Sequence, residues 1–324
     1  MNKKRIISII MLIILMILSL GIDAREDVNL ITILQGNPEA LEILFISRIP
    51  RTITILLTAS ALSVAGLIMQ AIGRNKFVAP SIAGTTQAAA LGILLTSLLI
   101  PGTPIWGKFL FSFSLSMLAT FFFLYFLNKI QFKNEIYIPL IGLMFGSLIG
   151  ALTTLIAQMT NTLQVLNAIG VGSFTNKTIG TYEIILLIVP ALIFAFMYVT
   201  KFSIVSMGKD FSQNLGVKYN KVLTIGLLIV SLISASTYIV VGPLPFLGLI
   251  IPNIVSIYYG DNLKKNIWDI AIFGSIFVFI CDLLARTLIF IFTGMRYELS
   301  VGFIMGIIGS IIFLWLIFRR VKHA

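Results

Sequence analysis

Few residues of this sequence combine a reactive type with a spacing that could support chemistry. Residues 102–108 spell most of a phosphate-binding loop, but Phe109 stands where that motif needs a Ser or Thr for magnesium, and no strand precedes it. The single cysteine, Cys281, lies in an apolar run, and the single histidine, His323, is next to the end of the chain. We therefore expect no catalytic residue, no disulfide, no metal site and no cofactor in this chain; Mg-ATP, if used, would bind a separate subunit.

Two opposite charges stand inside one apolar run. Asp282 and Arg286 are four residues apart, in the order that lets them pair on one face of a helix. Charges inside a membrane span are costly and usually mark ion pathways. A proton-coupled carrier more often has unpaired carboxylates, so we interpret Asp282 and Arg286 as a structural ion pair and keep a gating role as the alternative.

A third pattern is a glycine repeat. Gly142, Gly146 and Gly150 recur every four residues and would give one helix a smooth face. Such a face permits close helix packing, and packing within one subunit is its commoner use. The alternative that we keep is that the three glycines line a translocation path or a dimer seam.

The composition requires that these residues be positioned by membrane-spanning helices. Of 324 residues, 58% are hydrophobic and 11% charged, and the mean hydropathy is +1.06. No soluble domain of this size could expose such a surface. We predict an all-α polytopic membrane protein with about ten spans, since each crossing needs about 20 apolar residues. The predicted spans are residues 6–22, 52–71, 83–100, 109–127, 136–158, 181–200, 222–241, 246–259, 267–285 and 299–318.

Two details of this arrangement follow from the pattern. Residues 163–172 form a short apolar piece that we predict to be a re-entrant helix. The first apolar run is longer than the core of a typical signal peptide and is followed by a poor cleavage site, so we expect a retained span.

The charges set the topology. The formal net charge is +11, yet the basic residues lie in short loops between spans and form no continuous patch for nucleic acid. An even number of spans places both termini on one side, and the excess of Lys and Arg in the loops of that side makes it the cytoplasm. We expect a multi-pass protein of the plasma membrane with cytoplasmic N- and C-termini.

The longest basic loop, residues 201–222, lies on the predicted cytoplasmic side. It contains Lys201, Lys209, Lys218 and Lys221. Within it we predict two short helices, residues 210–215 and 217–222, hinged at Gly216, where a residue free to adopt positive φ allows the turn. A hinged helical loop suits docking onto a soluble partner, and the alternative is a solvated connector between two spans.

Ordered motifs along the chain carry a resemblance to a known family. The N-terminal half contains Arg48-Ile-Pro-Arg51, Ala65-Gly-Leu-Ile-Met-Gln70 and Arg74-Asn-Lys-Phe-Val-Ala-Pro80. The C-terminal half contains Leu215-Gly-Val217, Phe246-Leu-Gly-Leu-Ile-Ile-Pro252, Cys281-Asp-Leu-Leu-Ala-Arg286 and Glu298-Leu-Ser-Val-Gly302. Together they resemble the FecCD-type permeases of ABC importers for iron siderophores and cobalamin, from about residue 48 to residue 320.

The resemblance implies a type II ABC importer permease fold, with residues 1–324 as a single transmembrane domain. It implies a second permease subunit, cytoplasmic ATPase subunits and an extracellular substrate-binding lipoprotein as partners, and no nucleic acid. It also implies roles for individual residues. Those expected to couple to the ATPase are Gly208, Asp210, Leu215, Gly216 and Val217; those expected to dock the binding protein are Arg48, Arg51 and, by position only, Arg296; those expected at the gate are Asn75 and Phe77.

Two departures from the common pattern narrow the branch. Most relatives have Asn-Pro-Leu where this chain has Asn75-Lys76-Phe77, and Pro-His where it has Pro252-Asn253. Both variants resemble Gram-positive permeases for catecholate siderophores such as petrobactin, which work as pairs of different subunits. We therefore expect a heterodimer rather than a homodimer, importing a ferric siderophore by alternating access. The alternative function is a secondary carrier or channel for a metal chelate without an ATPase.

Overall fold

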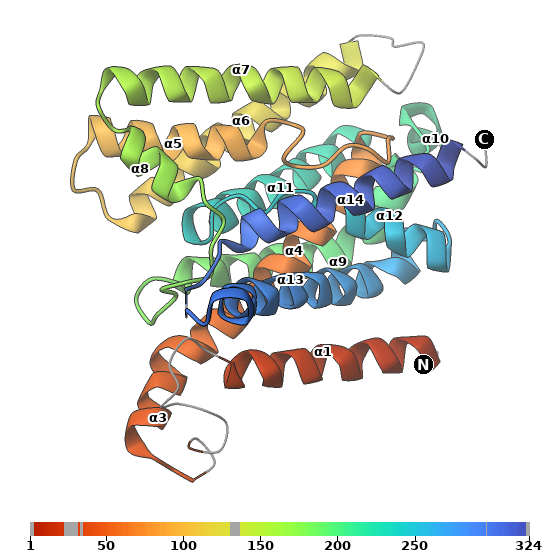
Figure 1. The fold of residues 1–324 in the computed structure, drawn as a ribbon. Coiled ribbons are helices and arrows are strands. Elements are labelled where there is room, and N and C mark those ends of the chain that lie inside the picture. Colours follow the sequence, from red (N-terminus) through yellow and green to blue (C-terminus); the bar gives the residue numbers. More distant parts are fainter. Residues whose placement is uncertain (1–2, 23–31, 33–34, 130–136, 296, 322–324) are drawn as a thin grey trace.

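The computed structural model describes residues 3–22, 32, 35–129, 137–295 and 297–321, and within these ranges it contains helices and loops but no strand (Figure 1). The long helices are α1 (Lys3–Gly21), α4 (Ile49–Ile72), α6 (Ile105–Lys129), α7 (Tyr137–Met159), α9 (Ile188–Val205), α11 (Tyr219–Val240), α13 (Leu263–Thr293) and α14 (Val301–Val321). The shorter elements are α3 (Pro38–Ile43), α5 (Thr85–Leu99), α8 (Leu163–Ile169), α10 (Lys209–Asn214) and α12 (Leu247–Tyr259), with a π-helical turn η1 (Leu44–Arg48) and a 3-10 turn η2 (Glu183–Leu187).

The apolar helices correspond in position to the ten predicted spans. In the described residues eight helical segments are long and apolar enough to cross a membrane, and α5 and α12 are shorter apolar helices. The protein is an all-α, multi-pass membrane protein, and the expected short helix after α7 is present as α8.

Helix α13 extends further than predicted. The predicted span ended at residue 285, whereas the helix continues to Thr293. Arg286 is bonded to Asp282 on the same helix and to backbone carbonyls of α1, so its charge is compensated inside the bundle. A compensated charge need not end a span.

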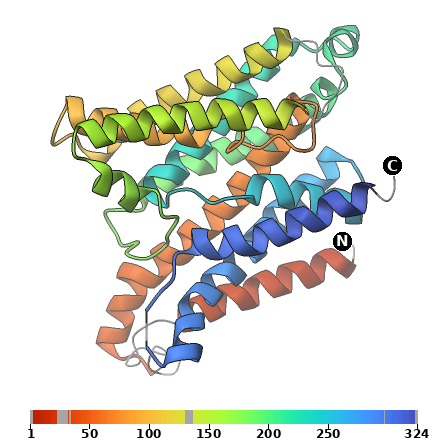
Figure 2. The ribbon, with the colours of Figure 1, turned by 45° about the horizontal axis from the view of Figure 1, so that its top comes forward.

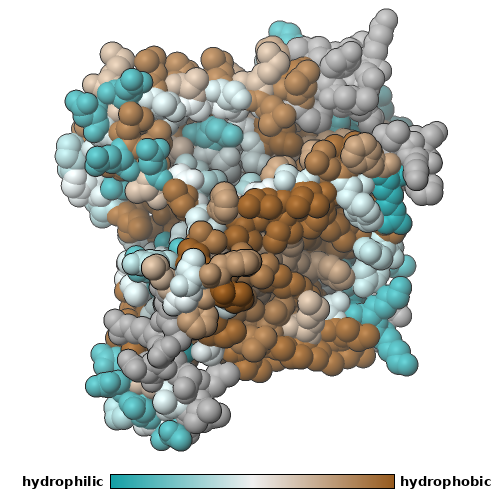
Figure 3. Space-filling view, in the orientation of Figure 1, coloured by the Kyte–Doolittle hydropathy of each residue, from teal (hydrophilic) through white to brown (hydrophobic). Residues whose placement is uncertain are grey.

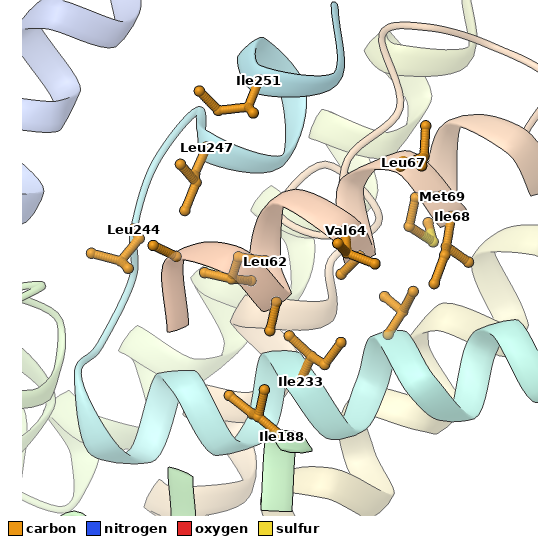
Figure 4. Close-up of a cluster of buried hydrophobic side chains, with 14 of the residues drawn as sticks. Leu62, Val64, Leu67, Ile68, Met69, Ile188, Ile233, Leu244, Leu247 and Ile251 are labelled. Carbon is orange, nitrogen blue, oxygen red and sulfur yellow. The ribbon is translucent and has the colours of Figure 1, made fainter. Parts of the chain in front are cut away.

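Helix α4 forms the centre of the bundle, and it packs against α9, α11, α12 and α13. Small residues allow the closest approach, since a Cβ on Gly66 would overlap the backbone of Gly248 in α12. Larger apolar side chains fill the remaining space. Figure 4 shows this cluster, in which Leu62, Val64, Leu67, Ile68 and Met69 of α4 lie among Ile188, Ile233, Leu244, Leu247 and Ile251.

The two ends of the bundle are distinct. Both ends of the described chain and α10 lie at one end, here called the terminal end, whereas α3 and α8 lie at the opposite end, here called the far end (Figures 1 and 2). Between them the outer surface is largely apolar, and Figure 3 shows a broad hydrophobic face over α13 and α14. Exposed apolar residues are expected where helices meet lipid or another membrane subunit.

The loop at residues 201–222 differs in part from its prediction. Its first short helix is α10, and Gly216 has φ +72°, as the hinge requires. The second predicted helix, residues 217–222, is not separate, because Tyr219 already begins α11 and the helix continues through Val222 without a break. The apolar residues that follow extend the helical face, so nothing in the sequence ends the first turn.

Candidate translocation and coupling sites

Three buried side chains and one half-buried side chain form an ion cluster at the far end. Arg51 on α4 donates from Nη1 to both carboxylate oxygens of Glu298, at 3.0 and 2.9 Å, and from Nη2 to Asp282 Oδ1 at 2.8 Å. Arg286 Nη2 donates to the other oxygen of Asp282. We call Arg51, Asp282, Arg286 and Glu298 the far-end ion cluster; its two positive and two negative charges balance. It joins α4, α13 and the segment that leads into α14.

The far-end ion cluster also holds the end of α1. Arg286 Nη1 donates to the carbonyls of Ser19 at 2.9 Å and Ile22 at 2.7 Å, and Arg48 Nη1 donates to Leu20 at 2.6 Å. The last carbonyls of a helix have no partner within the helix and carry its partial negative charge. Two arginines therefore cap α1 from neighbouring elements.

The positions of the arginines bear on their expected docking role. Arg48 is 3% exposed and Arg51 8% exposed, and both are bonded within this chain. Arg296 lies outside the described residues. The role of these arginines in docking a binding protein stays a prediction, and for Arg51 it would require an incoming carboxylate to displace Glu298.

Lys177 is a further cation at this end. It lies half-buried in the loop between α8 and η2 and has no ion pair in the described part of the chain. Burial, and secondly the charge of Arg51, lower the pKa of Lys177 below its ordinary value. Thr175, two residues earlier, donates to Glu298 at 2.8 Å, so this loop is tied to the far-end ion cluster.

At the terminal end, residues 73–84 connect α4 to α5; we call them the terminal-end loop. Asn75 Oδ1 accepts a hydrogen bond from the Phe77 amide at 2.7 Å, which fixes the turn. Lys76 Nζ donates to Asp261 at 2.6 Å and to Ser256 Oγ at 3.2 Å. Asn253 Nδ2 donates to the carbonyl of Lys76 at 2.8 Å. The two departures from the family pattern, at residues 75–77 and 253, are therefore in direct contact.

Aromatic contacts attach the same loop to α14. The rings of Phe77 and Phe313 meet edge to face with centroids 6.3 Å apart, and Phe313 lies 6.0 Å from the ring of Phe246. Phe246 has φ +64°, and a Cβ on Gly309 would lie 2.9 Å from it. Gly309 thus makes room for a strained residue at the start of α12, and Phe313 of α14 contacts both Phe77 and Phe246.

The loop at residues 201–222 lies against the terminal-end loop. Gly208 has φ +113°, and a Cβ on Gly208 would lie 3.7 Å from Nη1 of Arg74. Asp210, Leu215 and Gly216 are exposed, and Val217 is half-buried. A partner that binds this exposed surface would therefore lie close to the predicted gate, with the contact between Gly208 and Arg74 connecting the two.

The glycine face of α7 packs inward. A Cβ on Gly142 would lie 2.6 Å from the side chain of Ile82, and one on Gly146 would lie 3.3 Å from Gln87. This geometry favours helix packing within the chain for Gly142 and Gly146 over a path wall. Gly150 differs, because a Cβ there meets only Gln87 Cγ, at 3.9 Å, beside an open cavity.

Several functional contacts were missed by the sequence analysis. Only Asp282 and Arg286 were singled out as charges within spans, but Arg5, Arg51 and Asp269 also lie in long helices. Arg5 Nε donates to Asp269 Oδ1 at 2.8 Å and ties the start of α1 to α13. Asp269 lies inside its predicted span, so its presence was a usable signal. No pattern in the sequence indicated the ion pair between Lys76 and Asp261.

The bundle of long apolar helices defines a multi-pass membrane protein. A family model described as "FecCD transport family" matches residues 7–319. The chain belongs to this family.

Individual relatives match along nearly their full length. The chain is 43% identical to the petrobactin import system permease protein YclN of Bacillus subtilis, over 97% of this chain and 98% of that protein. It is 35% identical to the petrobactin import system permease protein FatD of Bacillus anthracis, over 99% and 92%. A solved structure described as an inward-facing conformation of a metal-chelate type ABC transporter has a TM-score of 0.79 at 22% identity, covering 96% of this chain and 97% of that one. That likeness shows the fold.

Proposed function

We propose that this protein is the permease subunit of an ATP-driven ABC importer that carries a ferric siderophore of the catecholate type into the cytoplasm. The observation that supports this most is the 43% identity, over nearly the whole of both chains, to a permease of a petrobactin import system. The subunit itself carries out no bond chemistry. Its task is to open a path for a polar chelate alternately to each side of the membrane.

A secondary carrier or channel fits the contacts less well. Such a carrier needs an ion-coupling group, and Asp282 was the carboxylate considered for it. Asp282 is 0% exposed and is bonded to two arginines, so its charge is already compensated. A carboxylate that binds and releases protons during transport is usually less tightly paired.

In the proposed assembly, separate ATPase subunits bind below the terminal end. The exposed residues Asp210, Leu215 and Gly216 supply the surface, and Gly208 passes movement to Arg74 and the terminal-end loop. Movement of that loop would carry Phe77 away from Phe313 and open the cytoplasmic end of the path. Because coupling free energy is reciprocal, a loaded binding protein at the far end would favour closure of the ATPase.

The remaining partners and the orientation follow the same proposal. A second permease subunit, different from this one, would complete the path, with a homodimer as the alternative. An extracellular lipoprotein would deliver the chelate to the far end. The terminal end, with both termini, would face the cytoplasm of a cell whose plasma membrane holds the protein, as the distribution of Lys and Arg supports.

The test is uptake of radio-iron by cells with and without this subunit. The cells are offered catecholate, hydroxamate and citrate-type chelates, with labelled cobalamin alongside. We expect loss of catecholate uptake alone. Loss of another chelate instead would correct the substrate, and unchanged uptake of every compound would contradict the proposal in a strain without a second importer.

The docking role of Arg51 has a test that leaves the arginine in place. Glu298→Gln weakens the internal competitor for Arg51. If a carboxylate of the lipoprotein binds Arg51, the variant should bind the lipoprotein more tightly, measured with the assembled importer in nanodiscs. Affinity equal to that of the unchanged protein would remove Arg51 from the docking surface.

A further inference from the structure

A polar cavity lies between α5, α7, α8 and α11, towards the far end. Its volume is about 280 Å³. It opens beside the exposed residues Thr154 and Asn167 and ends at the buried residues Thr153 and Tyr238. The walls carry hydroxyl and amide groups, and none of the described residues that line it is charged. Such a lining is unusual between helices that are otherwise apolar.

A smaller recess of about 20 Å³ adjoins the cavity, and Tyr238 and Thr86 line both. Ser234 and Thr237 of α11 also line this recess. Both are at most 2% exposed, and their hydroxyls make no hydrogen bond within the described part of the chain. A buried hydroxyl without a partner costs free energy, so these two groups require a hydrogen-bonding partner from outside the protein.

Gly150 of α7 leaves room for the cavity because it has no side chain. Gly150 lines the cavity, and a Cβ there would meet only Gln87 Cγ. The space beside Gly142 and Gly146, by contrast, is filled by neighbouring side chains of this chain. The glycine repeat therefore permits helix packing at Gly142 and Gly146, whereas Gly150 lines the open cavity.

We propose that this cavity is a subsite for an uncharged, hydroxyl- or amide-bearing part of the transported chelate; this rests on the proposed function. A cavity of about 150 Å³ can hold one benzene ring, so this one has room for a ring with an attached amide but not for a whole ferric siderophore. The iron centre of a catecholate chelate is anionic, and a neutral lining offers it no counter-charge. The site therefore takes the organic arm and leaves the iron centre in the wider path.

The single cysteine of this chain makes a direct test possible. Cys281 is 0% exposed, so a cysteine introduced elsewhere can be labelled against little background. Asn167→Cys places a thiol at the opening and Thr153→Cys places one on the inner wall. Ser114→Cys, on an exposed face of α6 outside the cavity, is the matched control.

Labelling uses a small charged methanethiosulfonate reagent on the complete importer in membrane vesicles. The probe is radio-iron-loaded petrobactin, delivered by the lipoprotein. We expect both cavity thiols to react and the chelate to slow these reactions severalfold. The Ser114→Cys thiol should react far more slowly, because the exposed face of the apolar helix α6 meets lipid, which excludes a charged reagent. Uptake of the same radio-iron is measured in the same vesicles.

The outcomes separate the two proposals. Uptake that depends on this subunit, without protection of either cavity thiol, overturns the subsite and leaves the importer standing; the cavity then holds water alone. Uptake that does not depend on this subunit overturns the proposed function. Protection together with uptake supports both.

A filling variant gives an independent measurement. Gly150→Leu extends a side chain into the cavity without pushing on backbone, and we expect it to reduce uptake of the petrobactin probe by about tenfold or more, since it displaces every hydrogen bond that the arm makes there. Ser114→Leu adds similar volume on the exposed face of α6 and should leave uptake unchanged. Equal uptake by the two variants would contradict the subsite, and the cysteine measurements still decide if Gly150→Leu fails to fold.

Discussion

Ion pairs lie at both ends of the bundle, and their lengths are similar: 2.8 Å between Arg51 and Asp282 at the far end and 2.6 Å between Lys76 and Asp261 at the terminal end. They differ in burial. The side chain of Asp282 is 0% exposed and that of Asp261 is 63% exposed. Breaking a buried pair leaves an uncompensated charge in a medium of low dielectric constant, whereas water replaces the partner in an exposed pair.

This difference in burial indicates that the ion pairs at the two ends have different roles. The far-end ion cluster joins α1, α4, α13 and the segment before α14 in one arrangement that is costly to disrupt. The ion pair of the terminal-end loop, between Lys76 and Asp261, is exposed and can exchange with water. A transport protein whose terminal-end loop moves needs weak contacts in that loop, whereas elements joined by a buried ion cluster are expected to move together.

The largest effect should come from Asp282→Asn. The variant leaves Arg51 and Arg286 with one charged partner, Glu298, between them, so we expect a loss of about 3–5 kcal/mol in the free energy of unfolding. The measurement is the thermal midpoint of the purified permease in detergent, followed by size-exclusion chromatography. Asp261→Asn is the matched control, and the same loss in both variants would mean that burial does not separate the two ends.

Features that lie within one helix were predictable from the sequence, and contacts between distant residues were not. The helices followed from apolar runs, because the length needed to cross a bilayer is fixed by its thickness. The pairing of Asp282 with Arg286 followed from their four-residue spacing. The bonds from Arg51 to Asp282 and Glu298 join residues 231 and 247 positions apart, and no local pattern encodes such contacts. They depend on how α4 and α13 pack.

The glycine repeat of α7 shows the same limit. Its spacing predicted a smooth helix face, which is present, but not what that face meets. Ile82 and Gln87 fill it at Gly142 and Gly146, and the cavity opens at Gly150. Those neighbours come from the segment before α5 and from α5 itself, so the distinction needed the packed structure.

A smaller effect is expected from Phe77→Ala. Its ring contacts Phe313 edge to face, and an aromatic pair of this kind contributes about 0.5–1.5 kcal/mol beyond its buried area. We expect a modest loss of stability and, if the loop is the cytoplasmic gate, faster ATP hydrolysis without loaded lipoprotein. Phe121→Ala on the exposed face of α6 removes a ring of equal size and is the control. Unchanged basal hydrolysis in Phe77→Ala would remove the ring from the gate.

The smallest effect on stability should come from Lys76→Met, because exposed ion pairs contribute about 0–1 kcal/mol. Its effect on transport should be larger than its effect on stability, since Lys76 connects the terminal-end loop to Asp261 and Ser256 at the start of α13 and the end of α12. We expect ATP hydrolysis to become less dependent on loaded lipoprotein. Lys264→Met removes an exposed cation from the same surface and is the control.

Reversing the two charges distinguishes an effect of the ion pair between Lys76 and Asp261 from another effect of the Lys76 side chain. Lys76→Asp alone places two acids together and should uncouple hydrolysis most strongly among these variants, and adding Asp261→Lys should restore part of the dependence on lipoprotein. A free energy of unfolding that stays within about 1 kcal/mol of that of the unchanged protein would show that coupling was lost without unfolding. Failure of the double variant to recover would mean that the Lys76 side chain acts through Ser256 and not through the ion pair.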